Sequence, residues 1–591
     1  MEKSKITKSL AVFASVLLII IIGVASFAYF GTFNVNLNNN VAVNINSSSP
    51  GNATFTSNAT QLNLQVPAAN MSFTVANNTV AAKEDTAFLD VTLTGSQNLL
   101  TTCTYDIVYE YDAESNVYGQ GTTTKTGDAT KEITIEVNGM NGNNHFATET
   151  NFNFDTSKGW SNATSTKGAK VTLVTGATLK SLGSEQSTRW KVIGRYYNLD
   201  LNQYALSGKS FTGKIYVENV NCSTEDGTTV KKGYETILAN NGGKTAIEAK
   251  GTPDFSASAT ENEGMYKATD DLGTSYYFRG AVDNNWVKYG KYTKDTYYGW
   301  DDNKGYNILT ESCNGVENCY KIASKGDDIY WRIIRINGDN SIRLIYAGTD
   351  APDSNTKITM AVQPDELTEK TSIGYSLFNV ANESAEYVGY MYTIGEQHGT
   401  SQSSTIKTYL EDWYANYTDL NKIGTKITDQ IYCNDRTAST NSSGATGEIS
   451  SWASMGTDYY YGAHNRIWGD GSKSNPILTC ANANDKFSTT TTKGNGKLSY
   501  PVGLITADEV NMAGVNNYLN NKSYYLYTGK WYWLGSPFNF ESDCTAVFKV
   551  DKDSLTYDFF FQDQGVRGVV SLSSDAKLLG SGTYDDVYIV E

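Results

Sequence analysis

The run from Phe538 to Phe561 holds the side chains of this sequence that are best suited to binding a ligand. It places aromatic rings beside carboxylates, a combination that either packs a core or contacts a partner. Because successive side chains of a strand point to opposite faces, we expect alternate residues to pack inside and the others to face the ligand. The candidate ligand-binding residues are Asn539, Phe540, Glu541, Asp543, Tyr557, Asp558, Phe559 and Phe561.

Residue types that carry catalysis lack the spacing that catalysis needs. The histidines His145, His398 and His464 are isolated in the sequence, and a lone histidine is more often a surface or core residue than a ligand. The sequence contains no His-Glu-x-x-His motif, no glycine-rich phosphate loop and no Gly-x-Ser-x-Gly elbow. We therefore predict that the protein is not an enzyme and that it uses no metal and no cofactor.

The cysteines divide in chain order into pairs, with one left over. A zinc site is disfavoured, because the two nearest cysteines are spaced C-x5-C with no histidine nearby. Sequence does not fix connectivity, and buried thiols are the alternative to disulfides. The order predicts the disulfides Cys103–Cys222, Cys313–Cys319 and Cys433–Cys480, and it leaves Cys544 over.

Length and charge narrow the class of protein. A chain of 591 residues is too long for one core, so we expect two or three domains. The formal net charge is -16, which argues against nucleic acids and anionic lipid surfaces as partners. The abundance of Gly, Tyr, Thr and Asn favours β structure over helix.

An uncharged apolar stretch, Leu10–Phe30, follows the lysines near the N-terminus. A helix of about twenty residues spans the ~30 Å hydrocarbon core of a membrane, with its basic end in the cytoplasm. The small residues Ser26 and Ala28 also fit a signal peptide that is cleaved on secretion. We expect residues 1–31 to be a transmembrane anchor or a signal segment, and the rest of the chain to be extracellular, either anchored in the cell membrane or secreted to the cell surface.

Residues 32–222 form a series of short β-branched or aromatic runs separated by Gly, Asn or Asp clusters. No helical period interrupts them, so we expect a β-sandwich of the jelly-roll kind. The predicted strands are Gln61–Val66, Met71–Val75, Ala87–Leu93, Cys103–Tyr111, Lys131–Val137, Lys170–Val174, Trp190–Tyr197 and Lys214–Val220.

Two parts of this region carry a family resemblance. The tripeptide Ala28-Tyr29-Phe30 and the closing segment Leu199–Val220, with its Gly-Lys-Ser-Phe element, resemble the camelysin and biofilm-fibre family of Gram-positive surface proteins. The resemblance covers residues 9–222 and implies a jelly roll that self-associates into a matrix or fibres. Some members are called metalloproteases, but the missing His-Glu-x-x-His motif argues against carrying that activity over.

The C-terminal part begins after a change in composition. Residues 223–263 are rich in Gly, Thr and Asn and predict a linker, and residues 264–591 form the second domain. Apolar spacing predicts a helix over Ser404–Tyr417, and the capping box Thr506–Glu509 begins another. Between them, residues 433–496 read as a long insertion rich in Ser, Gly, Thr and Asn.

The clearest local signal of the second domain is a hairpin over Tyr330–Gly348. Its two strands flank Asn337-Gly338, a dipeptide that accepts the positive φ angles of a tight turn. The arginines expected on the wetter face of this hairpin are Arg332, Arg335 and Arg343.

The segment Trp531–Leu572 carries a second resemblance. An aromatic strand ending in Ser-Pro, a strand near Ala546–Val550 and a closing Gly-Val-Arg strand resemble the C-type-lectin-like superfamily, most closely its formylglycine-generating-enzyme and phage-tropism-determinant branch. With the hairpin and the two helices the resemblance covers residues 264–591. The chain departs from the pattern at Gly568, where proline is usual, and Cys544 has no neighbouring cysteine, so oxidase chemistry is not implied. The resemblance does imply that the Phe538–Phe561 run is an exposed binding face.

These observations predict a mainly β protein with a smaller α+β part, namely a jelly-roll-like β-sandwich followed by a C-type-lectin-like α+β domain. We expect a cell-surface binding or adhesion protein, held to the membrane by its N-terminal segment, whose lectin-like head binds a protein or glycan ligand. The leading alternative is a secreted, self-associating subunit of a surface fibre or biofilm matrix. A metal-dependent enzyme, either a protease or a formylglycine-type oxidase, is a third alternative that the missing ligand spacings disfavour.

Overall fold

A computed structural model gives the fold, and its described residues cover most of the chain after the N-terminal segment. The predicted anchor or signal segment, Leu10–Phe30, lies outside them, as does the predicted strand Met71–Val75. Among the described residues no helix is long and apolar enough to cross a membrane. The described residues are 34–35, 41–46, 52–65, 83–96, 98–112, 133–138, 149–151, 168, 170–196, 210–352, 371–381, 383–439, 459–468, 474–516, 520–541, 544–559 and 563–591.

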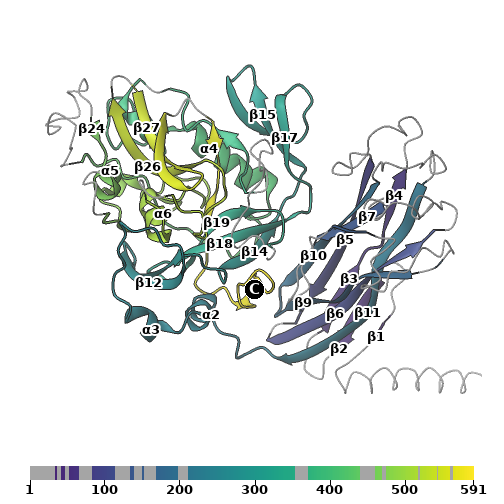
Figure 1. The fold of residues 1–591 in the computed structure, drawn as a ribbon. Helices are drawn as coiled ribbons and strands as arrows, with labels where there is room; N and C mark the ends of the chain where they lie inside the picture. The colour runs from purple at the N-terminus through teal and green to yellow at the C-terminus, as the bar shows by residue number, and fades with distance from the viewer. Residues whose placement is uncertain are drawn as a thin grey trace, which may run out of the picture. The chain divides into compact units, whose positions relative to one another are not determined.

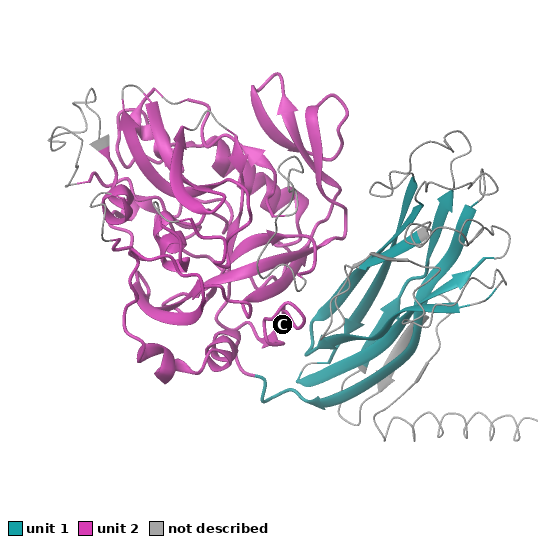
Figure 2. Cartoon of the chain, viewed as in Figure 1, with its two compact units in different colours: residues 1–230, 591 teal, residues 231–590 magenta. Residues whose placement is uncertain are grey.

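The chain divides into two compact units, which Figure 2 distinguishes by colour. Unit 1 comprises residues 1–230 together with Glu591, and unit 2 comprises residues 231–590. Strands dominate both units and short helices occur in unit 2 (Figure 1), so the prediction of a mainly β protein with a smaller α part is confirmed.

Unit 1 contains two sheets in its described residues. The first runs in the order β1-β11-β6-β9, with β4 also paired to β11, and the second in the order β2-β3-β5-β10-β7-β8. Every strand predicted here overlaps an observed one, apart from the one outside the described residues. The strands are β1 Asn34–Val35, β2 Val41–Asn46, β3 Asn52–Ser57, β4 Thr60–Gln65, β5 Lys83–Thr94, β6 Leu99–Tyr111, β7 Ile133–Asn138, β8 Glu149–Asn151, β9 Lys170–Ser181, β10 Glu185–Tyr196 and β11 Ser210–Asp226.

Side chains from both sheets of unit 1 form one hydrophobic core, as in a sandwich. Along β5 every second residue from Ala87 to Leu93 is buried, which is the alternation of a strand with one face inward. The indole of Trp190 on β10 donates a hydrogen bond to the hydroxyl of Tyr105 on β6 at 3.0 Å, so this buried polar pair joins the two sheets. The Cys103–Cys222 disulfide links the adjacent strands β6 and β11.

Unit 2 is built around an eight-stranded sheet of order β12-β13-β18-β14-β32-β31, in which β19 pairs with β18 and with β30. A second sheet has the order β20-β29-β26-β27-β28, with β24 paired to β26, and a small sheet has the order β16-β15-β17. The strands are β12 Asn262–Asp270, β13 Gly273–Gly280, β14 Trp286–Lys291, β15 Thr296–Asp301, β16 Tyr306–Thr310, β17 Glu317–Ala323, β18 Asp328–Ile336, β19 Ile342–Gly348, β20 Tyr375–Ser376, β21 Met391–Tyr392, β22 Gln402–Ser403, β23 Tyr432–Cys433, β24 Tyr459–Tyr460, β25 Lys486–Phe487, β26 Tyr532–Glu541, β27 Cys544–Asp551, β28 Ser554–Phe559, β29 Gln564–Gly565, β30 Val569–Leu572, β31 Leu578–Leu579 and β32 Tyr588–Val590.

Short helices complete unit 2. The predicted helix over Ser404–Tyr417 is present as α4 followed by a π-helical turn, η6, and the hydroxyl of Ser404 caps it by accepting from the Lys407 N–H at 3.2 Å. Residues 223–263, predicted as a linker, include α2 and α3, whose Ile237 and Ile247 lie in the core of unit 2. The helices are α2 Gly233–Asn240, α3 Lys244–Glu248, η5 Ala385–Val388, α4 Thr405–Asp412, η6 Trp413–Tyr417, α5 Gly462–Ile467, η8 Ala483–Asp485 and α6 Ala507–Ala513.

The predicted hairpin is present as β18 and β19, but its turn is longer than a two-residue turn. The last strand pair is Ile336 with Ile342, and the N–H of Asn337 donates to the carbonyl of Ser341 at 2.8 Å. The positive φ of the turn, 66°, falls on Asn340 and not on Gly338. Asparagine tolerates this left-handed conformation because its short side chain can bond locally, so the turn uses a different residue from the one that the dipeptide predicts.

The prediction that the hairpin arginines line a wet face is wrong, because both faces of β18 and β19 are buried. Arg332 lies over the Trp286 ring, 4.2 Å from its centroid, and donates to the Val282 carbonyl at 2.6 Å. Burial lowers the pKa of Arg332 to about 9. Arg335 and Arg343 are neutralised by carboxylates from elsewhere in unit 2, which the period of the strand alone does not reveal.

All three predicted disulfides are present, and Cys544 is not in a disulfide. Disulfides persist in oxidising compartments, so their presence indicates an extracellular or otherwise oxidising environment.

The Cys103–Cys222 disulfide should contribute more stability than Cys313–Cys319. Its cysteines are 119 residues apart, against 6 for the other pair, and in the chain-entropy model the larger loop gives about 5 kcal/mol and the smaller about 2 kcal/mol. We expect Cys103→Ser/Cys222→Ser to lower the free energy of unfolding of unit 1 by that larger amount. Pulse proteolysis at increasing urea concentration measures it, with mass spectrometry following the peptides that come from unit 1. Equal losses for the two double variants would contradict this prediction.

Candidate functional site

The predicted ligand-binding residues that the structure describes lie on β26 and β28 of the second sheet of unit 2. Asn539 and Phe540 are buried, with 3% and 7% of their surfaces exposed. Glu541 is exposed, and Tyr557 is 37% exposed. Asp558 and Phe559 are half-buried, whereas Asp543 and Phe561 lie outside the described residues. The sheet therefore brings only part of the predicted set to a surface.

The exposed part belongs to a cluster of rings that we call the aromatic platform. Its centre is Tyr557, whose ring is stacked on that of Phe538 with centroids 3.9 Å apart and planes 9° apart. Phe559, two residues further along β28, meets Tyr557 edge to face at 6.5 Å. The residues of the aromatic platform are Tyr460, His464, Trp468, Phe538, Tyr557 and Phe559.

Half of the residues of the aromatic platform come from residues 433–496, which the sequence predicts to be a long insertion. Tyr460 is the last residue of β24, whereas His464 lies in α5 and Trp468 is its C-cap. The spacing of four places His464 and Trp468 on one side of the helix. The ring of Tyr460 stacks on that of His464 at 3.9 Å, and Trp468 contacts Phe538 at 5.4 Å. The spacing of four between His464 and Trp468 is the sequence signal that could have revealed these two rings.

His464 acts as an aromatic ring and not as a titrating group at neutral pH. Burial lowers the pKa of His464 to about 4, so its imidazole is neutral. Its Nδ1 has no hydrogen-bond partner among the described residues. Its ring packs edge to face against Phe538 at 4.9 Å, which fits a packing role within the aromatic platform.

Asp558 points to the opposite side of β28 from Tyr557 and Phe559, as strand alternation requires. Its carboxylate accepts from the Lys549 ammonium at 2.6 Å and from the Gln564 amide at 2.9 Å. Asp558 is therefore engaged on the other face of the sheet and does not contribute to the aromatic platform.

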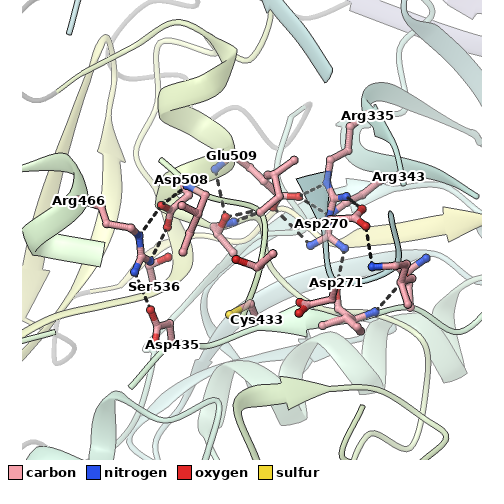
Figure 3. Close-up of a pocket in the computed structure, with 17 residues that line it drawn as sticks. Asp270, Asp271, Arg335, Arg343, Cys433, Asp435, Arg466, Asp508, Glu509 and Ser536 are labelled. Atoms are coloured by element: carbon pink, nitrogen blue, oxygen red, sulfur yellow. Dashed lines mark hydrogen bonds and ion pairs between the residues drawn. The ribbon is translucent and has the colours of Figure 1, made fainter. Parts of the chain in front are cut away.

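Unit 2 also contains a pocket lined by charged side chains, which we call the charged pocket (Figure 3). Its cavity volume is only about 30 Å³, and the Cys433–Cys480 disulfide lies beside it through Cys433. Figure 3 shows guanidinium and carboxylate groups turned toward one another across it. The charged residues that line it are Asp270, Asp271, Arg335, Arg343, Asp435, Arg466, Asp508 and Glu509.

Glu509 is the centre of one ion network in this pocket. Its carboxylate lies 3.0 Å from Nε of Arg335 and 2.7 Å from Nε of Arg343. Arg335 also binds Asp270 on β12. Burial alone would raise the pKa of Glu509, but the charges of Arg343 and Arg335 and the hydrogen bond from the Thr506 N–H outweigh it and lower that pKa.

The same carboxylate completes the capping box that the sequence predicts. The Thr506 N–H donates to Glu509 Oε2 at 3.0 Å, and the Thr506 hydroxyl accepts from the Glu509 N–H at 3.1 Å. The first turn of α6 is thereby fixed to the two arginines of the hairpin.

A second network satisfies the remaining carboxylates. Arg466 of α5 binds Asp508 through two nearly parallel hydrogen bonds of 2.8 and 2.9 Å, and it donates to Asp435 at 2.8 Å. Asp508 and Asp435 raise the pKa of Arg466 against the lowering effect of burial. Asp271 accepts from Lys486 at 2.8 Å. Each carboxylate of the charged pocket is thus held by a cation, so the pocket is organised as a structural ion network.

The described residues contain no group of three or more His, Cys, Asp or Glu side chains arranged to hold a metal ion. Comparison with protein-family models finds no matching family, and comparison with curated proteins finds no match.

Replacing Glu509 with glutamine should destabilise unit 2 in a pH-dependent way. Removing one partner of a buried ion pair costs about 3–5 kcal/mol. The pKa of Glu509 is lower in the folded state than its unfolded-state value of about 4.3. Glu509 therefore stabilises the fold at pH values above about 4.3, and this stabilisation is lost as the pH falls through the folded-state pKa. We expect urea unfolding to show a large deficit for Glu509→Gln at pH 7 that shrinks in acid.

The matched control is Glu235→Gln. Glu235 holds the same third position of the first turn of α2 and accepts from the Lys232 N–H at 3.3 Å, but it is exposed. We expect at most about 1 kcal/mol from this variant. A Glu509→Gln deficit as small as that of the control would show that the arginines do not depend on Glu509.

Proposed function

We propose that this chain is a cell-surface binding protein whose unit 2 is a C-type-lectin-like head for a protein or glycan ligand, acting without catalysis. The observation that carries the proposal is the aromatic platform. One face of the Tyr557 ring rests on Phe538, and 37% of the Tyr557 surface remains exposed. Exposed aromatic rings held in place by other rings are the side chains that most often dominate binding energies.

The platform suits recognition by shape. Tyr557 is held from the side by Trp468 at 6.0 Å and by Phe559 at 6.5 Å, so little rotational freedom remains to be lost when a ligand binds. A flat, pre-positioned ring offers apolar area to the apolar face of a sugar or to a side chain of a protein. The exposed carboxylate of Glu541 near the end of β26 adds a hydrogen-bond acceptor.

The location follows from the same proposal. The disulfides support an oxidising environment, and Leu10–Phe30 would act as membrane anchor or as cleaved signal. The fibre-subunit alternative attributes the main activity to unit 1 instead, and it requires self-association without any ligand.

The test compares binding of the full chain and its Tyr557→Ala variant to an array of oligosaccharides and to an array of extracellular proteins. Loss of a central aromatic contact costs about 2 kcal/mol or more, so we expect at least about a tenfold loss of affinity for every ligand found. The conservative variant Tyr557→Phe should retain binding.

The matched control is Tyr320→Ala, since Tyr320 is 38% exposed and stacks on Tyr298 in a different sheet. It should bind like the unmodified chain. Equal binding by Tyr557→Ala and the unmodified chain would contradict the proposed site. High-order assembly together with no bound ligand on either array would favour the fibre subunit.

A further inference from the structure

An Asn-Gly dipeptide is chemically unstable when its atoms are free to move. The backbone nitrogen of the glycine attacks the side-chain amide carbon of the asparagine, the C–N bond to the amide nitrogen breaks, and ammonia leaves. Water then opens the resulting succinimide at either carbonyl, which gives aspartate or isoaspartate. Glycine favours the reaction because no Cβ shields its nitrogen. A hydrogen bond that holds either group opposes it.

The pair Asn314-Gly315 meets every condition for this reaction. It lies in the turn between β16 and β17, within the loop that the Cys313–Cys319 disulfide closes, and both residues are exposed. In the part of the chain that the structure describes, neither the Asn314 side chain nor the Gly315 N–H has a hydrogen bond. Apart from Gly315 and its two chain neighbours, no atom lies within 4 Å of the position that a Cβ of Gly315 would occupy, so no other part of the fold crowds the turn there.

The pair Asn337-Gly338 of the hairpin is protected. The Gly338 N–H donates to the Asp270 carboxylate at 2.9 Å, and the Asn337 amide donates to the Ser341 hydroxyl at 2.8 Å. Asn337 is also buried. The Gly338 nitrogen and the Asn337 amide carbon can meet only after local opening of the core.

The pair Asn495-Gly496 is held on both sides although it is only half-buried. The Gly496 N–H donates to the Ser488 hydroxyl at 3.2 Å, and the Asn495 amide donates to the Asn484 carbonyl at 2.7 Å. This pair separates the effect of hydrogen bonding from the effect of burial.

The pair Asn241-Gly242, just after α2, is held in the same way. The Asn241 amide donates to the Ile237 carbonyl at 2.8 Å, and the Gly242 N–H donates to the Ala239 carbonyl at 3.3 Å. The glycines at 139 and 142, which also follow asparagines, lie outside the described residues.

We propose that Asn314 is a site of spontaneous deamidation, and that the fold selects it over the other described Asn-Gly pairs. The product carries a new carboxylate close in sequence to the exposed Glu311 and Glu317, so the loop becomes more acidic. The isoaspartate product also inserts a methylene into the main chain inside the disulfide-closed loop, which changes the path of the turn.

The test is incubation of the full-length, disulfide-bonded protein at neutral and at mildly alkaline pH, followed by peptide mapping with mass spectrometry. We expect conversion of Asn314 to aspartate and isoaspartate, faster at the higher pH because the attacking nitrogen must lose its proton. The rate at Asn314 should exceed that at Asn337 by about tenfold or more, since an opening free energy of only about 1.4 kcal/mol gives that factor.

Two comparisons make the result decisive. In denaturant with the disulfides reduced, Asn314, Asn337, Asn495 and Asn241 should react at similar rates, which would assign the difference to the fold. In the folded protein, Asn314→Gln should remove the reactive site without affecting the others. The proposal is overturned if Asn314 in the folded chain keeps its amide as long as Asn337, or if Asn495 reacts as fast as Asn314.

Discussion

The guanidinium groups of Arg335 and Arg343 lie in the interior of unit 2 on neighbouring strands, and the carboxylate of Glu509 pairs with both while Asp270 supplies the second negative charge. Charges of this kind are very costly to bury unless their partners are in place. Arg335 and Arg343 come from the hairpin of β18 and β19, Glu509 comes from α6, and Asp270 comes from β12. The hairpin, the helix and the outer strand therefore have one mutual arrangement in which Arg335, Arg343, Glu509 and Asp270 are all paired.

The charged pocket and the aromatic platform are connected through α5. Arg466 on this helix is held by Asp508 and Asp435, while His464 and Trp468 of the same segment pack against Phe538. The ion pairs of Arg466 thus fix the position of α5, and the fixed helix holds His464 and Trp468 against Phe538. This division explains how a helix of six residues within a long insertion supplies part of a proposed binding surface.

Local signals in the sequence predict local structure well. The alternating runs of unit 1, the hairpin, the capping box of Thr506 and the chain-order disulfides depend on residues whose effects are local or whose pairing follows order, and each is present. The burial of Arg335 was not predictable, because Glu509 lies 174 residues away in sequence. The sequence does not predict the turn residue Asn340, because the Asn-Gly dipeptide is the stronger turn signal. It does not predict α5, because the insertion around that helix is polar in composition.

At the candidate site too, local sequence patterns do not reveal long-range packing. Strand alternation correctly predicts that Tyr557 and Asp558 face opposite sides of β28, but it does not tell which side is covered. Asn539 and Phe540 are buried where β24, supplied by the insertion, pairs alongside β26. Long-range packing thus reduced the predicted surface to its aromatic part and added rings from a segment with little regular pattern.

Hydrogen exchange of the full chain, followed by mass spectrometry, tests most directly whether Glu509 holds unit 2 together. The account predicts that Glu509→Gln accelerates exchange together in β12, β18, β19 and α6, the elements joined by its network, and leaves the strands of unit 1 unchanged. Acceleration confined to the first turn of α6 would contradict it, because that result would reduce Glu509 to a helix cap.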